Sequence, residues 1–334
     1  MNKKVVVLGG GTGMGSLLKG LKNFPVDISA IVSVSDDGKS TGRLREEFGI
    51  PAVGDVRKVL VALSNTKETL FEELLDYRFA TSSGLNGHTI GNLLLTAATN
   101  TCGNMSDGIE LLSKLLNLKG KVIPLTEDNV TLMAQMKDGS VIEGEHNITE
   151  ANNKIEYVYY KEKPIVNEIA VQAIYDADLV VLSMGSLYTS IIPNLLCSEI
   201  ITALDKSVSP ILYACNMMTQ PGETDDFKVS DHVNLLNKYL GEKKISVVVA
   251  NNEVIDEISR RKYETTEQKD PVLLDQENLY DVKVIANNYY IVENELIRHN
   301  SLKVASDIFT YMLFNMEHEQ DNKTIKQYLY HRKK

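Results

Sequence analysis

Two clusters of glycine, hydroxyl and carboxylate residues in this sequence have the composition of ligand-binding loops. The first is Gly9-Gly10-Gly11-Thr12-Gly13, which directly follows the apolar run Val5 to Leu8. Glycines let backbone N–H groups approach a ligand closely, and a helix that begins there adds unpaired donors and partial positive charge. We therefore predict that Gly10 to Gly13 receive a phosphate group. A turn that only packs a helix against a strand is the alternative.

These glycines do not fit the two common nucleotide-binding motifs. A dinucleotide motif framed from Gly9 or from Gly11 places Met14 or Ser16 where its third glycine is needed. The P-loop also fails, because Ser33 stands five residues before Gly38 where that motif needs a glycine. NAD-dependent oxidation, which an acidic residue near the second strand would suggest, is therefore the least favoured function.

The second cluster is the loop Ser35-Asp36-Asp37-Gly38-Lys39-Ser40-Thr41. Its carboxylates, hydroxyls and cation could hold a metal, a phosphate or a ribose, although a solvated turn uses many of the same residue types. Asp37, Ser40 and Thr41 are candidate ligand-binding residues, and Asp37 with Asp55 is a candidate Mg²⁺ pair. Capping the helix Lys58 to Leu63 is the simpler role for Asp55.

Further candidates lie at later turns of the chain. His88 and Asn92 open an apolar helix and, four residues apart, would share one of its faces. His88 could act as an acid, a base or a phosphate donor, whereas capping or packing is the commoner role of such a histidine. The remaining candidates each follow an apolar strand: Gly185 and Ser186 after Asp178 to Leu182, Asn216 after Ser209 to Tyr213, and Asn251 after Ile245 to Ala250.

Alternating strands and helices must position these loops. Apolar strands followed by amphipathic helices predict parallel pairing, and the carboxyl ends of such strands lie along one edge, where ligands bind. Between Thr126 and Lys163 the periodicity changes to a β-hairpin with an Asp-Gly turn and a further strand, Ile155 to Tyr160. We expect one Rossmann-like, doubly wound, mostly parallel α/β domain over residues 1–315, a β flap inserted at 126–163, and a polar helical tail at 316–334.

Composition narrows the classes of partner. The chain has 334 residues, 43% of them hydrophobic, and a net charge of -10, which disfavours a nucleic-acid or membrane surface as its main partner. Three widely separated cysteines favour neither a disulfide framework nor a zinc site. The N-terminus shows no secretory leader and no apolar run is long enough to span a membrane, so we expect a cytoplasmic protein without membrane insertion.

The loop motifs, in this order, resemble a known family. They are Gly9 to Gly13, Ser35 to Gly38, Ser40 to Arg45, Gly54 to Arg57, Asn86 to His88, Gly91-Asn92, Gly185 to Ser190, Thr219 to Thr224 and Arg298-His299-Asn300. Together they resemble the YvcK-type gluconeogenesis factors of bacteria, within the wider 2-phospho-L-lactate transferase (CofD-like) family. The resemblance covers Val5 to about Ser306.

The resemblance implies a Rossmann-like fold, binding of a UDP-sugar such as UDP-N-acetylglucosamine, and a role in cell shape and envelope synthesis during gluconeogenic growth. It also implies that Tyr263 and Arg298 contact the ligand, and that cell-envelope synthesis proteins are partners. A homo-oligomer is a further expectation. Ser301, beside Arg298, is a candidate target of a Ser/Thr kinase, with a helix N-cap as its simpler role.

Two functions remain open from the sequence. One is a UDP-sugar-binding regulatory protein that breaks no bond. The other is a Mg²⁺-dependent phosphoryl-group transferase in which Asp37 and Asp55 hold the metal. We favour the first, because no acceptor site is evident in the sequence.

Overall fold

The computed structural model describes residues 2–65, 69–151, 153–256, 269–293 and 296–314. Its centre is a sheet of seven strands in the order β10-β9-β8-β7-β1-β2-β3, and every neighbouring pair is parallel. Across the sheet these strands are β10 (Lys283–Asn287), β9 (Ile245–Asn251), β8 (Ile211–Ala214), β7 (Leu179–Leu182), β1 (Lys3–Gly9), β2 (Val26–Val32) and β3 (Lys121–Pro124). The predicted Rossmann-like, doubly wound class is confirmed.

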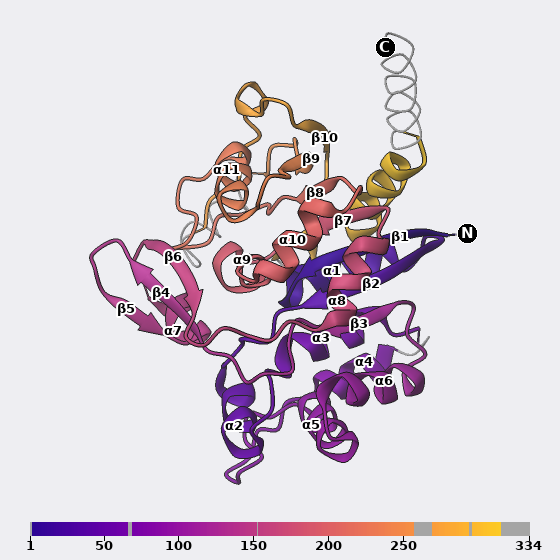
Figure 1. Ribbon diagram of the computed structural model, residues 1–334, viewed down its shortest axis with the longest axis vertical. Coiled ribbons are helices and arrows are strands. Elements are labelled where there is room, and N and C mark those ends of the chain that lie inside the picture. Colours follow the sequence, from indigo (N-terminus) through magenta and orange to yellow (C-terminus); the bar gives the residue numbers. More distant parts are fainter. Residues whose placement is uncertain (1, 66–68, 152, 257–268, 294–295, 315–334) are drawn as a thin grey trace, which may run out of the picture.

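Helices cover both faces of this sheet (Figure 1). The side chains of β1 alternate, so that Val5 and Val7 pack on one face while Val6 and Leu8 pack on the other. The first face carries α1 (Gly11–Leu21), α2 (Lys39–Phe48), α3 (Gly54–Leu63), α4 (Thr69–Asp76), α5 (Ile90–Cys102), α6 (Met105–Leu115) and helical residues 301–314. The second carries α8 (Glu168–Asp176), η1 (Leu187–Ile191), α9 (Ile192–Leu195), α10 (Ser198–Lys206) and α11 (Val229–Tyr239).

The predicted flap is present between β3 and α8. Its strands β4 (Leu132–Met136), β5 (Val141–Glu143) and β6 (Ile155–Tyr160) form an antiparallel sheet in the order β5-β4-β6. The expected turn is confirmed at Gly139, whose φ of +89° is readily adopted only by glycine. Buried flap residues such as Leu132 and Val158 belong to the same apolar cluster as the second sheet face, so the flap packs on the main core.

Several elements differ from the sequence expectation. Helix α1 begins at Gly11, so the glycine turn is itself the first helical turn. The polar segment after Asn147 contains the end of a short helix, α7 (Glu145–Glu150). Beyond β9 lie elements that the sequence pattern did not predict: η2 (Gln276–Asn278), β10, and the hairpin of β11 (Tyr290–Glu293) and β12 (Leu296–His299). The C-terminal tail 316–334 lies outside the described residues.

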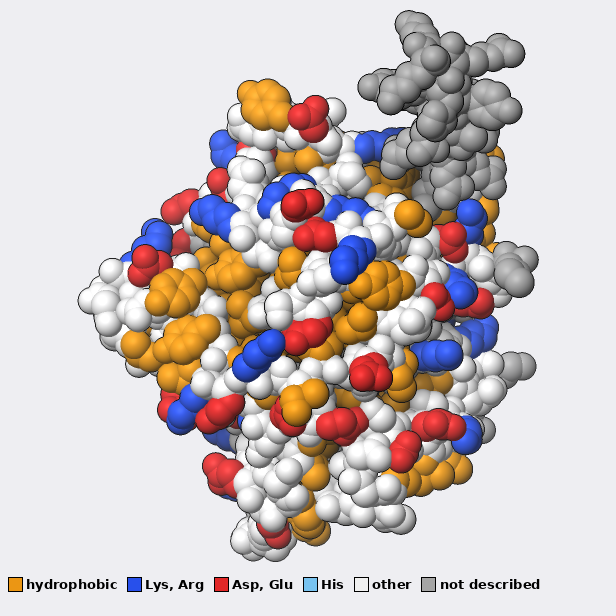
Figure 2. Space-filling view, viewed as in Figure 1, with side chains coloured by type: hydrophobic (Ala, Val, Ile, Leu, Met, Phe, Trp, Pro, Cys, Tyr) orange, Lys and Arg blue, Asp and Glu red, His pale blue; other side chains and the backbone are white. Residues whose placement is uncertain are grey.

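Charges of both signs are interspersed with apolar side chains on the face seen in Figure 2, without a continuous basic field. None of the described helices is by itself long and apolar enough to cross a membrane. The bent pair Leu187–Leu195 and Ser198–Lys206 meets that length and composition only when its two parts are taken together.

Candidate functional site

The chain changes direction across the sheet between β1 and β7. After β1 it runs outward through β2 to β3, and then returns to β7 on the other side of β1 before continuing to β8, β9 and β10. In open parallel sheets, ligands bind at such a switch point, outside the carboxyl ends of the strands. The first glycine turn follows β1 and the Gly185-Ser186 turn follows β7, so both lie at this crevice.

A pocket of about 390 Å³ opens at this crevice. Six residues predicted from the sequence line it: Thr12, Gly13, Gly185, Ser186, Asn216 and Arg298. They come from four loops and strands that are far apart in the chain. Its volume lies in the lower part of the range of small-molecule sites.

The glycines of the first turn serve two different purposes. A Cβ at Gly13 would lie 2.3 Å from the carbonyl oxygen of Met184, so this glycine lets α1 pack against the turn after β7. Gly10 and Gly11 face Asp55 instead, at 2.5 Å and 3.5 Å from its carboxylate to the position of an added Cβ. Gly10 and Gly11 therefore do not line the pocket, whereas Thr12 and Gly13 of this turn do.

Asn216 fixes the second turn from the end of β8. Its Oδ1 accepts a hydrogen bond from the Gly185 N–H at 2.8 Å, and its Nδ2 donates to the Gly185 carbonyl at 2.7 Å. Both backbone polar groups of Gly185 are thereby held by one side-chain amide. Asn216 therefore lines the pocket and also fixes the backbone of Gly185, another lining residue.

The Ser186 hydroxyl is fully occupied by its neighbours. Its Oγ donates to Oε2 of Glu223 at 2.6 Å and accepts from the backbone N–H and the hydroxyl of Thr189 at 3.0 Å and 2.8 Å. Burial raises the pKa of Glu223 to about 7. A negatively charged ligand at Ser186 is therefore better tolerated when Glu223 is protonated.

Arg298 reaches the pocket from β12. Its side chain is exposed, and the structure gives it no ion pair within the described part of the chain. The neighbouring His299 is held through its Nε2, which donates to the Cys215 carbonyl at 3.1 Å. Shielding from water lowers the pKa of His299 to about 4, so its ring is neutral. This bond ties β12 to the end of β8.

Ser40, His88 and Asn92 form a second, separate network. The Asn92 amide donates to Ser40 Oγ at 3.0 Å, which leaves the Ser40 proton for Nδ1 of His88, also at 3.0 Å. Burial and the nearby Arg43 lower the pKa of His88, in keeping with a neutral acceptor nitrogen. The prediction that His88 shares a helix face with Asn92 was wrong, because His88 precedes Thr89, the N-cap of α5.

Acidic side chains gather between this network and the glycine turn. Thr41 Oγ1 donates to Asp36 at 3.0 Å, and Asp37 accepts the His146 N–H of the flap at 2.7 Å. Glu145, at the start of α7, has its pKa raised to about 8 by burial and then by Asp36 and Asp55. The flap thus brings a further carboxyl group to the loops that follow β2.

Asp55 is not a helix cap, contrary to our expectation. The N-cap of α3 is Val53, without a side-chain bond, and Asp55 lies inside the first turn. Its Oδ1 accepts from Lys58 Nζ at 3.0 Å, and burial raises its pKa. No group of three or more His, Cys, Asp or Glu side chains among the described residues is placed to hold a metal ion.

Asn251, another predicted site residue, is not among the residues that line the pocket. Asn251 uses its Oδ1 to accept the Tyr289 N–H at 3.0 Å and its Nδ2 to donate to the Glu253 carbonyl at 2.8 Å. It thereby connects β9 to the segment before β11. Tyr263 lies outside the described residues.

The sequence reasoning missed Glu145 and Glu223. Glu223 belongs to the Gln220-Pro221-Gly222-Glu223 segment, where a carboxylate directly after a Pro-Gly turn gave a weak signal. Glu145 carried no signal, because its polar surroundings resemble an ordinary loop.

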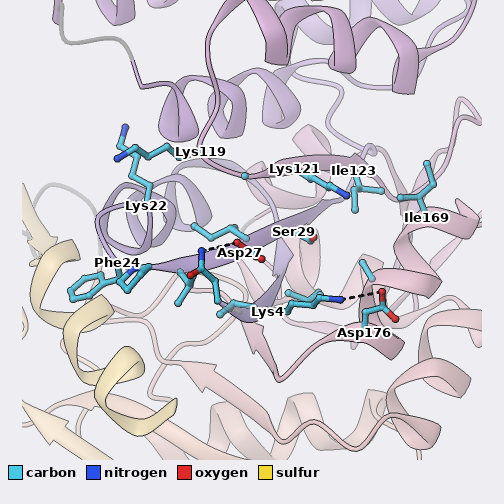
Figure 3. Close-up of a pocket in the computed structure, with 18 of the residues that line it drawn as sticks. Lys4, Lys22, Phe24, Asp27, Ser29, Lys119, Lys121, Ile123, Ile169 and Asp176 are labelled. Atoms are coloured by element: carbon cyan, nitrogen blue, oxygen red, sulfur yellow. Dashed lines mark hydrogen bonds and ion pairs between the residues drawn. The ribbon is translucent and has the colours of Figure 1, made fainter. Parts of the chain in front are cut away.

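A larger cavity, of about 940 Å³, lies at the opposite edge of the sheet. Its side chains are shown in Figure 3. Lys4 pairs with Asp176 at 3.5 Å, and Lys22 Nζ donates to the Ser64 carbonyl at 2.8 Å. Two of its lysines are thus engaged by the protein itself, and the cavity lies at the amino ends of the strands. The convergence of predicted residues favours the switch-point pocket as the functional site.

The fold and this pocket define a Rossmann-like α/β protein with a pocket at the crevice between β1 and β7. The family model described as 2-phospho-L-lactate transferase CofD matches residues 5–290. A gluconeogenesis factor from Halalkalibacterium halodurans is 43% identical over 310 residues, which are 92% of this chain and 95% of that protein. The Bacillus subtilis gluconeogenesis factor is 44% identical over 308 residues, 91% and 96% of the two chains.

A crystal structure of a Bacillus halodurans protein superposes with a TM-score of 0.89 at 42% identity, covering 92% of this chain and all of that one. This chain therefore belongs to the gluconeogenesis factor family, with the CofD-like fold.

Proposed function

We propose that the chain binds a UDP-sugar, of the UDP-N-acetylglucosamine type, in the switch-point pocket and acts as a cytoplasmic regulatory protein. The convergence of Gly13, Ser186 and Arg298 in one pocket supports this proposal. Gly13 belongs to the first turn of α1, where backbone donors and the helix dipole favour a diphosphate. The Arg298 guanidinium can bind two phosphate oxygens at once.

The regulatory role that we propose is in cell shape and envelope synthesis during growth on gluconeogenic carbon, with cell-envelope synthesis proteins as partners. A homo-oligomer is part of the same proposal. Ser301 is its proposed kinase target. Asn300, rather than Ser301, caps helical residues 301–314, because its Oδ1 accepts the Lys303 N–H at 3.1 Å. The Ser301 hydroxyl instead contacts Ser16 of α1 at 2.8 Å.

A Mg²⁺-dependent phosphoryl-group transferase is the second candidate, and the acidic side chains after β2 favour it. Magnesium in proteins is commonly held by one or two carboxylates together with substrate phosphates. Asp37, in the loop after β2, and Asp55, in the first turn of α3, are the two carboxylates that we propose for it. When bound, the ion would neutralise charge on the transferred group.

Calorimetry on the full-length chain tests the first proposal. We expect one UDP-N-acetylglucosamine to bind per chain, more tightly than GDP or NAD. Equal affinity for all three nucleotides, or no binding, contradicts it. Incubation with UDP-sugars and a deazaflavin acceptor, with and without Mg²⁺, separates the two candidates: metal-dependent release of a nucleotide product supports the transferase and contradicts a purely binding role.

A further inference from the structure

A second cavity, of about 970 Å³, lies between the flap and α11. Its aromatic lining includes Tyr157 of β6, Tyr188 of η1 and Tyr239 of α11. Tyr239 packs against the buried apolar cluster that contains Val158 of β6, which joins the two walls. The cavity therefore lies between two packed elements, the flap and α11, and its volume is in the upper range of small-molecule sites.

Three lysines from both walls line this cavity: Lys137 and Lys154 from the flap and Lys238 from α11. Within the described residues, none of their ammonium groups has a hydrogen bond or an ion pair. Four acidic side chains also line the cavity: Glu156, Glu223, Asp225 and Asp231. Three of them are engaged locally, since Glu223 accepts from the Ser186 hydroxyl at 2.6 Å, Asp225 accepts the Gly222 N–H at 3.0 Å and Asp231 accepts the Lys228 N–H at 2.9 Å. The lysines are therefore available to an anionic ligand, and the exposed Tyr157 and half-buried Tyr239 to a flat ring, while Tyr188 is buried beneath them.

One segment connects this cavity to the switch-point pocket. Thr219 and Gln220 line the pocket, while Glu223 and Asp225 line the cavity. Glu223 accepts from Ser186 at 2.6 Å, so a residue of the cavity wall bonds directly to a residue of the pocket wall. On its other side the segment packs on the flap, because a Cβ at Gly222 would lie 3.0 Å from the Ala151 carbonyl oxygen.

From this arrangement we propose that the cavity between the flap and α11 is a second ligand site, which binds a nucleoside monophosphate. The base lies against Tyr157 and Tyr239, the phosphate lies among the three lysines, and the acidic rim receives ribose hydroxyls. Ligand binding in this cavity affects the switch-point pocket through the hydrogen bond between Glu223 and Ser186. A ligand that holds the flap against residues 219–225 also fixes Glu223, so the first pocket is preorganised and binds more tightly. Only this coupling rests on the proposed UDP-sugar function.

Equilibrium dialysis of the full-length chain with radiolabelled AMP tests the site itself. We expect saturable binding, weakened at least tenfold in the triple variant Lys137→Ala, Lys154→Ala, Lys238→Ala. The matched control is Lys3→Ala, Lys119→Ala, Lys121→Ala, which removes the same charge at the amino edge of the sheet and should bind AMP as the wild type does. No saturable binding at millimolar AMP, or equal loss in both triple variants, overturns the proposal.

Calorimetry with UDP-N-acetylglucosamine, with and without saturating AMP, tests the coupling. We expect at least threefold tighter UDP-sugar binding with AMP, and loss of this gain in Glu223→Gln. Competition between the two ligands would place AMP in the first pocket and overturn the second site. If UDP-N-acetylglucosamine does not bind at all, the proposed function fails, while AMP dialysis on the lysine variants still decides whether the cavity is a site.

Discussion

Replacing Arg298 by alanine gives the sharpest test of the switch-point pocket. The side chain is exposed on β12 and has no ion pair among the described residues, so its removal should change the free energy of unfolding by less than about 0.5 kcal/mol. A lost hydrogen bond to a charged phosphate costs about 1.5–3 kcal/mol. The dissociation constant for UDP-N-acetylglucosamine should therefore rise by about 10- to 150-fold.

Two further variants separate a local contact from a general charge effect. Lys121→Ala removes one positive charge at the opposite edge of the sheet (Figure 3). Because salt screens charges beyond about 8 Å at physiological ionic strength, we expect less than about a twofold change in affinity. Arg298→Lys keeps the charge without the planar fork and should recover part of the loss. Calorimetry would refute the assignment if Arg298→Ala binds normally, or if Lys121→Ala loses as much.

Three other substitutions test how the pocket region is built. Gly13→Ala places a Cβ 2.3 Å from the Met184 carbonyl and should lower stability by about 1–3 kcal/mol in urea unfolding, whereas Gly84→Ala, with nothing within 4 Å, should not. Ser40→Ala leaves His88 and Asn92 without their shared partner; we expect a loss of about 1–3 kcal/mol, and an unchanged unfolding midpoint would contradict the network. The pKa of Glu223 is raised to about 7 in the folded protein. Its contribution to stability is therefore fully present below the pKa that this carboxyl has in the unfolded chain, and is lost as pH rises through 7. Glu223→Gln should remove a pH-dependent loss of about 3 kcal/mol between pH 4 and pH 8, and an unaltered slope of stability against pH would refute it.

Local patterns in the sequence were enough to predict the parallel sheet. Val5 to Leu8 is apolar on both faces because helices cover both faces of β1, and such a continuous run is typical of a buried parallel strand. The Asp-Gly turn of the flap was equally local. Helix α7 was not predictable in this way, because its sequence is mostly polar and Ile148 is its one buried residue. The first turn of α7 is held by Asp37, which lies 109 positions earlier in the chain and accepts the backbone N–H of His146.

The residues of the candidate site were predicted individually more readily than their grouping. Strand ends and glycine turns are visible in the sequence, so Gly13, Ser186 and Asn216 could be named before their positions were known. Their partners could not, because the Ser40 contact with His88 spans 48 positions and the Ser186 contact with Glu223 spans 37. The left-handed backbone conformation of Gly11 was also hidden. Its φ of +66° means that valine there would disturb the backbone, so a binding test with Gly11→Val would confuse affinity with folding.

The two groups of predicted residues meet at the first glycine turn. Thr12 and Gly13 face the switch-point pocket, while Gly10 and Gly11 face Asp55 and the acidic side chains beyond it. A diphosphate bound at the start of α1 would therefore lie between Arg298 and the carboxylates that follow β2. Carboxylates beside a diphosphate are unfavourable unless they are protonated or share a cation with it. The raised pKa of Glu145 provides the first condition and Mg²⁺ the second, so the dependence of UDP-sugar affinity on Mg²⁺ and on pH distinguishes which condition this protein uses.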